Sequence, residues 1–129
     1  MIGYVNIGTN DIDRARAFYD GLLSPIGAGR MMEFPGGATA YGVDWTKPMI
    51  AVGPPFDGQP ATVGNGTMVA LVVDTRALVD AVHAKALALG GADEGAAGLR
   101  GEEGPQAFYA AYFRDPDGNK LCVFRVGPG

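Results

Sequence analysis

The chain has 129 residues, of which 47% are hydrophobic and 19% charged, and its formal net charge at pH 7 is −4. These values are typical of one soluble globular domain and exclude a disordered chain. The acidic balance and the scattered basic residues argue against nucleic-acid and membrane partners, because both require clustered positive charge.

The sequence also limits the cellular compartment. No apolar run approaches the roughly 20 residues that cross a bilayer, and residues 1–10 lack the basic and apolar segments of a signal peptide. A single cysteine, Cys122, excludes an internal disulfide and multi-cysteine zinc sites. We therefore expect a cytoplasmic protein.

The first half predicts a strand, a helix and three further strands. An apolar or small segment over 4–11 runs into Asn10 and Asp11, either of which can cap a helix. Apolar residues then recur from Ile12 to Leu23 at helical spacing, and Ser24-Pro25 ends the helix. Short strands are predicted over 30–34, 38–43 and 48–52.

The second half predicts the same order of elements. Residues 54–66 contain three prolines and three glycines and are predicted to link the halves. An apolar segment over 68–75 leads to a helix that Asp74 or Thr75 caps and Gly90-Gly91 ends. Strands are predicted over 107–114 and 120–126, on either side of the turn sequence Asp115-Pro116-Asp117-Gly118-Asn119. The glycine-rich stretch 92–106 is compatible with a strand or a loop.

The two halves are related by an offset of 64 residues, which aligns Tyr4 with Met68. Apolar and small positions coincide through the strand, the cap and the helix. Two βαβββ modules (1–53 and 67–129) within a single domain are the simplest account. This predicts an α+β fold with helices on one side of a mixed sheet.

Three features resemble the vicinal oxygen chelate superfamily, which includes glyoxalase I, bleomycin-resistance proteins, fosfomycin-resistance enzymes and extradiol dioxygenases. They are the two modules in about 130 residues, the helix sequence Asn10-Asp11-x-x-Arg14-Ala15-x-x-Phe18-Tyr19, and the 115–119 turn before the last strand. The resemblance covers nearly the whole chain. It implies a curved mixed sheet around a cavity with helices outside, and a homodimer.

The resemblance also implies where a divalent metal would bind. Its positions are occupied here by Tyr4, Ala51, Met68 and Cys122, where the superfamily usually has His, Glu or Gln. Ala51 has no ligating atom, and Met68 offers only a soft thioether. We therefore expect no metal and no other cofactor, and catalytic residues stay unassigned.

Strand alternation groups the side chains that would face the cavity. Most are aromatic or small, with a few polar groups, as in small-molecule sites. The same residue pattern is also compatible with a packed core or a dimer interface. Cys122 is expected to be a small buried strand residue, and the lone histidine, His83, a solvated helix residue. The resemblance implies that the loop 101–106 borders the mouth of the cavity, so Arg100 and Gln106 are expected to reach a ligand. The candidate ligand-binding residues are Tyr4, Asn6, Trp45, Met68, Phe108, Tyr112, Arg114 and Cys122.

Three functions are compatible with these features. The first is a metal-free protein of the bleomycin-resistance type that binds a small, partly aromatic molecule. The second is a glyoxalase-like lyase or isomerase, or a dioxygenase, with a noncanonical site. The third is a purely structural dimer. Loss of the usual metal ligands, with the aromatic face retained, favours the first.

Overall fold

The computed structural model describes all 129 residues and contains two βαβββ modules. The first has β1 (Tyr4–Gly8), α1 (Ile12–Leu22), the short 3₁₀ helix η1 (Ser24–Ile26), β2 (Gly29–Glu33), β3 (Thr39–Gly42) and β4 (Met49–Gly53). The second has β5 (Val69–Val72), α2 (Arg76–Ala88), β6 (Ala92–Arg100), β7 (Phe108–Arg114) and β8 (Lys120–Val126). The predicted α+β class with two βαβββ modules is confirmed.

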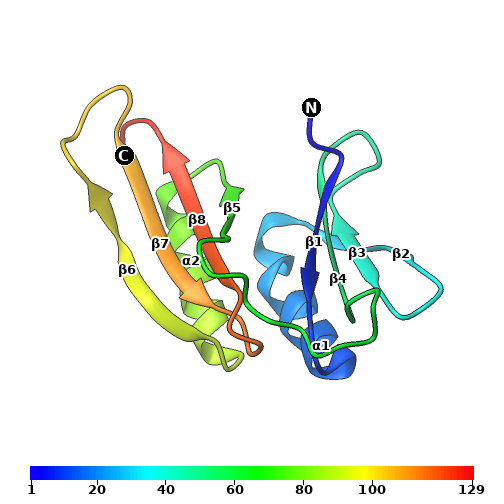
Figure 1. Cartoon of the computed structure of the whole chain (residues 1–129). Helices are drawn as coiled ribbons and strands as arrows, with labels where there is room; N and C mark the ends of the chain where they lie inside the picture. Colours follow the sequence, from blue (N-terminus) through cyan, green and yellow to red (C-terminus); the bar gives the residue numbers. More distant parts are fainter.

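The eight strands form two separate four-stranded sheets (Figure 1). Sheet A has the order β1-β4-β3-β2, and sheet B has the equivalent order β5-β8-β7-β6. The pairs β1–β4 and β5–β8 are parallel, whereas the other neighbours are antiparallel. Strands β1 and β5 are therefore edge strands, and each has a hydrogen-bonded neighbour on one side only.

Both helices begin at the predicted caps. The Asp11 carboxylate accepts a hydrogen bond from the backbone N–H of Arg14, and the Thr75 hydroxyl accepts one from Leu78. The stretch that the sequence left open contains the strand β6, whose pairing with β7 shifts register twice. None of the helices has the length and apolar composition that crossing a bilayer requires.

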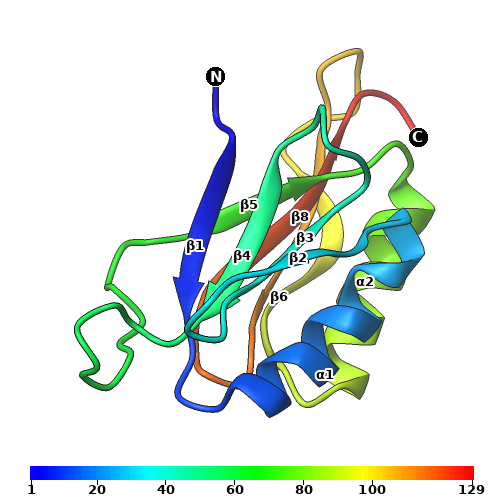
Figure 2. The ribbon, with the colours of Figure 1, turned by 90° about the vertical axis from the view of Figure 1, so that its right-hand side faces the viewer.

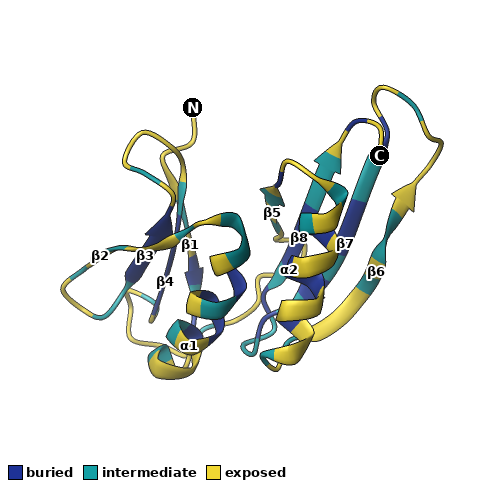
Figure 3. Cartoon of the chain, turned by 180° about the vertical axis from the view of Figure 1, so that it is seen from behind, coloured by how far each residue is buried: buried dark blue, intermediate teal, exposed yellow.

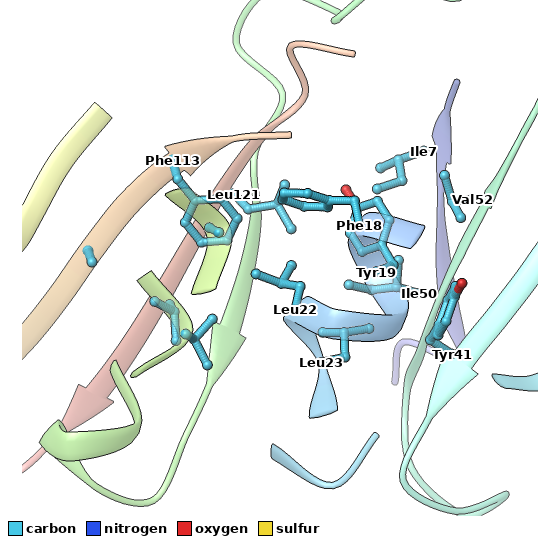
Figure 4. Packing of buried hydrophobic residues seen from close by; sticks show 14 of the residues in the cluster. Ile7, Phe18, Tyr19, Leu22, Leu23, Tyr41, Ile50, Val52, Phe113 and Leu121 are labelled. Carbon is cyan, nitrogen blue, oxygen red and sulfur yellow. The ribbon is translucent and has the colours of Figure 1, made fainter. Parts of the chain in front are cut away.

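The helix-covered faces of the two sheets turn toward each other. One buried cluster joins Val52 and Ile7 of sheet A, Phe18 and Leu22 of α1, and Phe113 of sheet B. Figure 4 shows the α1 side chains between residues of the two sheets. Seen side-on and from behind, both helices lie on the same side of the molecule, each with an exposed stripe (Figures 2 and 3). The uncovered face of each sheet, here called its outer face, therefore points away from the other module.

The turn 115–119 ties the two modules together. The buried carboxylate of Asp115 accepts a hydrogen bond from the Tyr19 hydroxyl of α1 at 2.6 Å. The Asn119 side-chain amide donates to Asp115 and to the carbonyl of Gly8, at 2.9 and 2.8 Å. The Asp117 carboxylate accepts hydrogen bonds from the Thr9 hydroxyl, the Asn10 backbone N–H and the Arg14 guanidinium of α1. This turn thus fixes sheet B against the β1–α1 corner of module one.

The prediction that His83 is solvated is wrong. Its ring is buried between α2 and sheet B, and Nε2 lies 3.0 Å from the Asp93 carboxylate on β6. The buried side of α2 includes Val79, Val82 and Ala86 as well as His83. The Asp93 carboxylate gives the imidazole a polar partner, which makes burial of the ring tolerable.

Candidate functional site

The outer face of sheet B carries an aromatic surface. Alternation along β7 and β8 sends Tyr112 and Cys122, which are register partners, to this face. One row further along, Phe124 lies opposite Ala110, and its ring stacks on Phe108 with centroids 5.3 Å apart. The face thus presents three partly exposed rings around small buried side chains.

Cys122 lies in the floor of this surface. Its side chain is almost fully buried, and burial raises the pKa of the thiol, although the nearby Arg100 and Lys120 charges oppose the rise. A raised pKa keeps the thiol protonated at neutral pH and therefore unreactive as a nucleophile. The only histidine is on the other side of the sheet, so no imidazole lies beside the thiol.

Three cations stand around the rings of sheet B. The guanidinium of Arg100 and the ammonium of Lys120 both lie 5.5 Å from the centroid of the Tyr112 ring. Arg114, two residues beyond Tyr112 on β7, forms an ion pair with Glu94 at 2.8 Å. This face therefore combines aromatic surface with positive charge.

The outer face of sheet A is largely uncharged. Tyr4 and Asn6 are exposed on β1, beside Met49 and Ala51 of β4. Trp45 lies in the turn that precedes β4, at the same end of the sheet as Tyr4, and its side chain is 66% exposed. Sheet A thus offers an apolar wall with a tyrosine, a tryptophan and one amide.

One copy of the chain does not bring the candidate residues into a single site. Tyr4, Asn6 and Trp45 belong to sheet A, whereas Phe108, Tyr112, Arg114 and Cys122 belong to the outer face of sheet B. The two outer faces point away from each other because the helices and the shared core lie between the sheets. Met68 precedes the edge strand β5, near the gap between the modules.

A cavity of about 780 Å³ lies in that gap. Its lining is mostly aliphatic and comes from β1, β4 and β5, together with Leu23 and Ile26. Met68 is the only candidate residue that lines it. This gap is a different place from the two aromatic outer faces.

The residues present do not fit a divalent metal. The four positions that the superfamily uses fall on two different sheets, with Tyr4 and Ala51 on sheet A, and Met68 and Cys122 on or beside sheet B. No three His, Cys, Asp or Glu side chains anywhere in the chain come close enough to hold an ion. The carboxylates and imidazoles that divalent ions prefer are missing from these positions.

Lys120 was not among the predicted ligand-binding residues, whereas Arg100 was predicted to reach a ligand from a loop and lies instead at the end of β6. Lys120 and Cys122 are two residues apart on β8, so strand alternation predicts that both side chains lie on the same face. The position of the Arg100 guanidinium had no sequence signal, because it depends on the register shifts of β6.

These features define the class of protein. The glyoxalase-like domain model matches residues 4–124, and the chain therefore belongs to that family, within the vicinal oxygen chelate superfamily. No curated protein gives a significant match.

Solved structures agree with this assignment. A glyoxalase/bleomycin resistance protein from Albidiferax ferrireducens is 34% identical, with 97% of this chain and 98% of that one covered and a TM-score of 0.85. A family enzyme from Burkholderia phytofirmans is 25% identical, with coverage of 96% and 97% and a TM-score of 0.71. A lactoylglutathione lyase from Agrobacterium tumefaciens is 24% identical, with coverage of 97% and 92% and a TM-score of 0.64, and shows the shared fold alone.

Proposed function

We propose that the protein binds a small, partly aromatic molecule without a metal, in a cavity that two copies of the chain build together. One observation carries this proposal. Each copy displays two half-sites, an apolar wall on sheet A and an aromatic, cationic surface on sheet B, on faces that point apart. A second copy related by two-fold symmetry can set its sheet A opposite sheet B of the first.

The free sheet edges support the same arrangement. Strands β1 and β5 have no neighbour on one side, and unpaired edges are templates for pairing with another chain. Large apolar side chains are exposed along them, with Val72 69%, Tyr4 63% and Met68 43% exposed. Placing β1 of one copy beside β5 of the other would cover these groups and create a curved surface of eight strands.

The side chains support binding rather than metal chemistry. The positions from which the superfamily coordinates an ion carry Tyr4, Ala51, Met68 and Cys122, which are no suitable set of ligands. Aromatic side chains are present on the same faces. Rings with a few polar groups are the usual lining of small-molecule sites. A cytoplasmic location stays a prediction.

A thermal-shift screen with a broad library of small aromatic compounds tests the proposal. A ligand that binds only the folded protein raises its Tm. We expect compounds that do so for the wild-type protein and lose the effect in Tyr4→Leu and in Tyr112→Leu. Phe56→Leu is the matched control, because Phe56 is fully exposed in the linker, and it should keep the effect.

Two results would contradict the proposal. One is that no compound in the library raises the Tm, or that the compounds raise the Tm of both tyrosine variants as much as that of the wild type. The other is a stoichiometric divalent metal in protein purified without chelators, measured by elemental analysis, which would favour the glyoxalase-like or dioxygenase alternative.

A further inference from the structure

Two of the three cations on the outer face of sheet B, Arg100 and Lys120, form no ion pair, whereas Arg114 is paired with Glu94. Six of the ten Lys and Arg residues have a carboxylate within 4.0 Å. The other four are Lys85, Arg100, Lys120 and Arg125. Lys85 is on α2, and alternation along β8 turns Arg125 to the helix-covered face. The remaining two, Arg100 and Lys120, flank one ring, that of Tyr112.

The fold holds the Arg100 side chain in place. Arg100 pairs with Phe108, but its guanidinium folds back along β6 to the level of Tyr112, which pairs with Gly95. Its two terminal nitrogens donate to the carbonyls of Gly98 and Ala96, at 2.9 and 2.7 Å. These bonds fix the guanidinium and leave its charge without a counter-charge.

Gly95 makes room for this conformation. A Cβ at Gly95 would lie 3.1 Å from the Tyr112 ring and 3.2 Å from the Arg100 guanidinium, closer than ordinary contact. A Cβ at Gly98 would lie 3.5 Å from the same group, which is an ordinary contact. The bulged, glycine-rich strand therefore lets an arginine lie over Tyr112, close to β6.

Lys120 approaches the same ring from the next row of the sheet. It pairs with Arg114, whose charge is already balanced by Glu94. The ammonium forms no hydrogen bond or ion pair in the structure, and Lys120 is half-buried. The Glu94 carboxylate, which pairs with Arg114, is near enough for the Lys120 charge to help lower the pKa of Glu94. Tyr112 is thus surrounded by two cations that form no direct ion pair, in a protein whose net charge is −4.

From this charge pattern we propose that the ligand is an organic anion, a molecule with an aromatic or apolar body and a carboxylate or a similar acidic group. The acidic group would lie between Arg100 and Lys120, and the body would lie on the rings of Tyr112, Phe108 and Phe124. Charge-assisted hydrogen bonds to such an anion are stronger than bonds between neutral groups. The inference rests on the proposed binding function and names the class of ligand.

A charge series of matched probes tests it. The probes are benzoate, naphthalene-2-carboxylate and biphenyl-4-carboxylate, the carboxamide of each, and 2-naphthylmethylammonium. Binding is followed at pH 7 and low salt by amide NMR shifts. We expect each carboxylate that binds to do so about tenfold more tightly than its carboxamide. Shifts are expected at Tyr112 and Cys122, and not at Leu23 and Ile26 in the gap between the modules.

Variants assign the preference to the two cations. Lys120→Met and Arg100→Met should each reduce the advantage of the carboxylate over its carboxamide, and the double variant should abolish it. Lys85→Met, which removes an unpaired lysine from α2, should leave the advantage unchanged. Each variant's Tm shows whether it folds, and the carboxamide affinity shows whether the apolar part of the site is intact.

The outcomes separate this inference from the binding function. Equal affinity for carboxylates and carboxamides, tighter binding of the ammonium, or an advantage that survives the double variant would overturn the anion proposal and leave binding in place. Absence of binding by every probe would overturn the anion proposal, whereas the binding function is overturned only when the broad thermal-shift library also gives no stabilising compound.

Discussion

Asp115 is a buried carboxylate whose partners come from both modules. It accepts hydrogen bonds from the Tyr19 hydroxyl, from the Asn119 amide and from two backbone N–H groups of its own turn. Burial and the adjacent Asp115 raise the pKa of Tyr19 well above its ordinary value, so this phenol stays a donor. The carboxylate is therefore fully satisfied, and removing any one donor leaves polar atoms unpaired in the interior.

Asn119→Ala is expected to destabilise the fold. It removes the donors to Asp115 and to the Gly8 carbonyl, and loss of buried hydrogen bonds that leaves acceptors unsatisfied costs about 2–3 kcal/mol. Urea unfolding monitored by circular dichroism measures the change. Asn65→Ala is the control, since Asn65 is exposed and its side chain forms no hydrogen bond. If the two substitutions lowered the free energy of unfolding equally, this would contradict a role of turn 115–119 in holding the modules together.

At the scale of elements, Asp20 joins α1 to sheet A. Its carboxylate accepts hydrogen bonds from Arg30 of β2 at 2.9 and 2.8 Å and from the Tyr41 hydroxyl of β3 at 2.9 Å. The hydrogen bonds from Arg30 lower the pKa of Asp20 below its ordinary value of 3.8, while burial and Asp20 raise that of Tyr41. The group is partly exposed, so the link is moderate in strength.

Because the pKa of Asp20 is lowered in the folded protein, the free energy of unfolding is expected to depend on pH. The ionised form is favoured in the folded protein, so its contribution to the free energy of unfolding is complete well above pH 3.8. It is lost as the pH falls through the lowered folded value. Asp20→Asn should therefore be less stable than wild type at about pH 7, with a difference that shrinks towards about pH 2. Urea unfolding across this range measures it.

Asp57→Asn is the control for this series, because Asp57 lies in the exposed linker without a cationic partner. A pH-independent difference between Asp20→Asn and wild type would show that the ionised form of Asp20 does not stabilise the fold.

The edge strands lead to a prediction about assembly. We expect wild-type protein to be a dimer at micromolar concentration and Val72→Lys to weaken self-association about tenfold or more, since a lysine on an edge strand opposes edge pairing. Analytical ultracentrifugation measures both. Leu87→Lys, at an exposed apolar position on α2, should still dimerise. Wild-type monomer at these concentrations would contradict the shared cavity.

At the scale of the whole molecule, the repeat, the helix caps and the turn sequence predicted the modules well, because each depends on local chemistry. The caps at Asp11 and Thr75 follow from their own side chains and the next turn of helix. Strand alternation also placed Tyr112 and Cys122 on one face. Local patterns did not predict how the two modules pack against each other, because this packing depends on the shared core and on the contacts of turn 115–119.

The site was predicted less completely for the same reason. Alternation identifies faces within a sheet, but whether two faces meet depends on packing between sheets and between copies. Arg100 is the clearest example. Its guanidinium lies beside Tyr112 because the register of β6 shifts twice and because it donates hydrogen bonds to two backbone carbonyls. Hydrophobic periodicity predicts neither feature. His83 shows it too, since its burial depends on Asp93 of another element.

The shared cavity is tested most directly by mixing two variants that cannot bind. Tyr4→Leu disables the half-site of sheet A, and Tyr112→Leu disables that of sheet B, so each homodimer should fail to bind a ligand found by the screen. After the variants exchange subunits, two-fold symmetry gives each mixed dimer one cavity with both tyrosines intact. Random exchange should then restore about a quarter of the wild-type sites, measured by calorimetric titration. No restored binding in mixtures shown to contain mixed dimers would contradict a cavity built from sheet A of one copy and sheet B of the other.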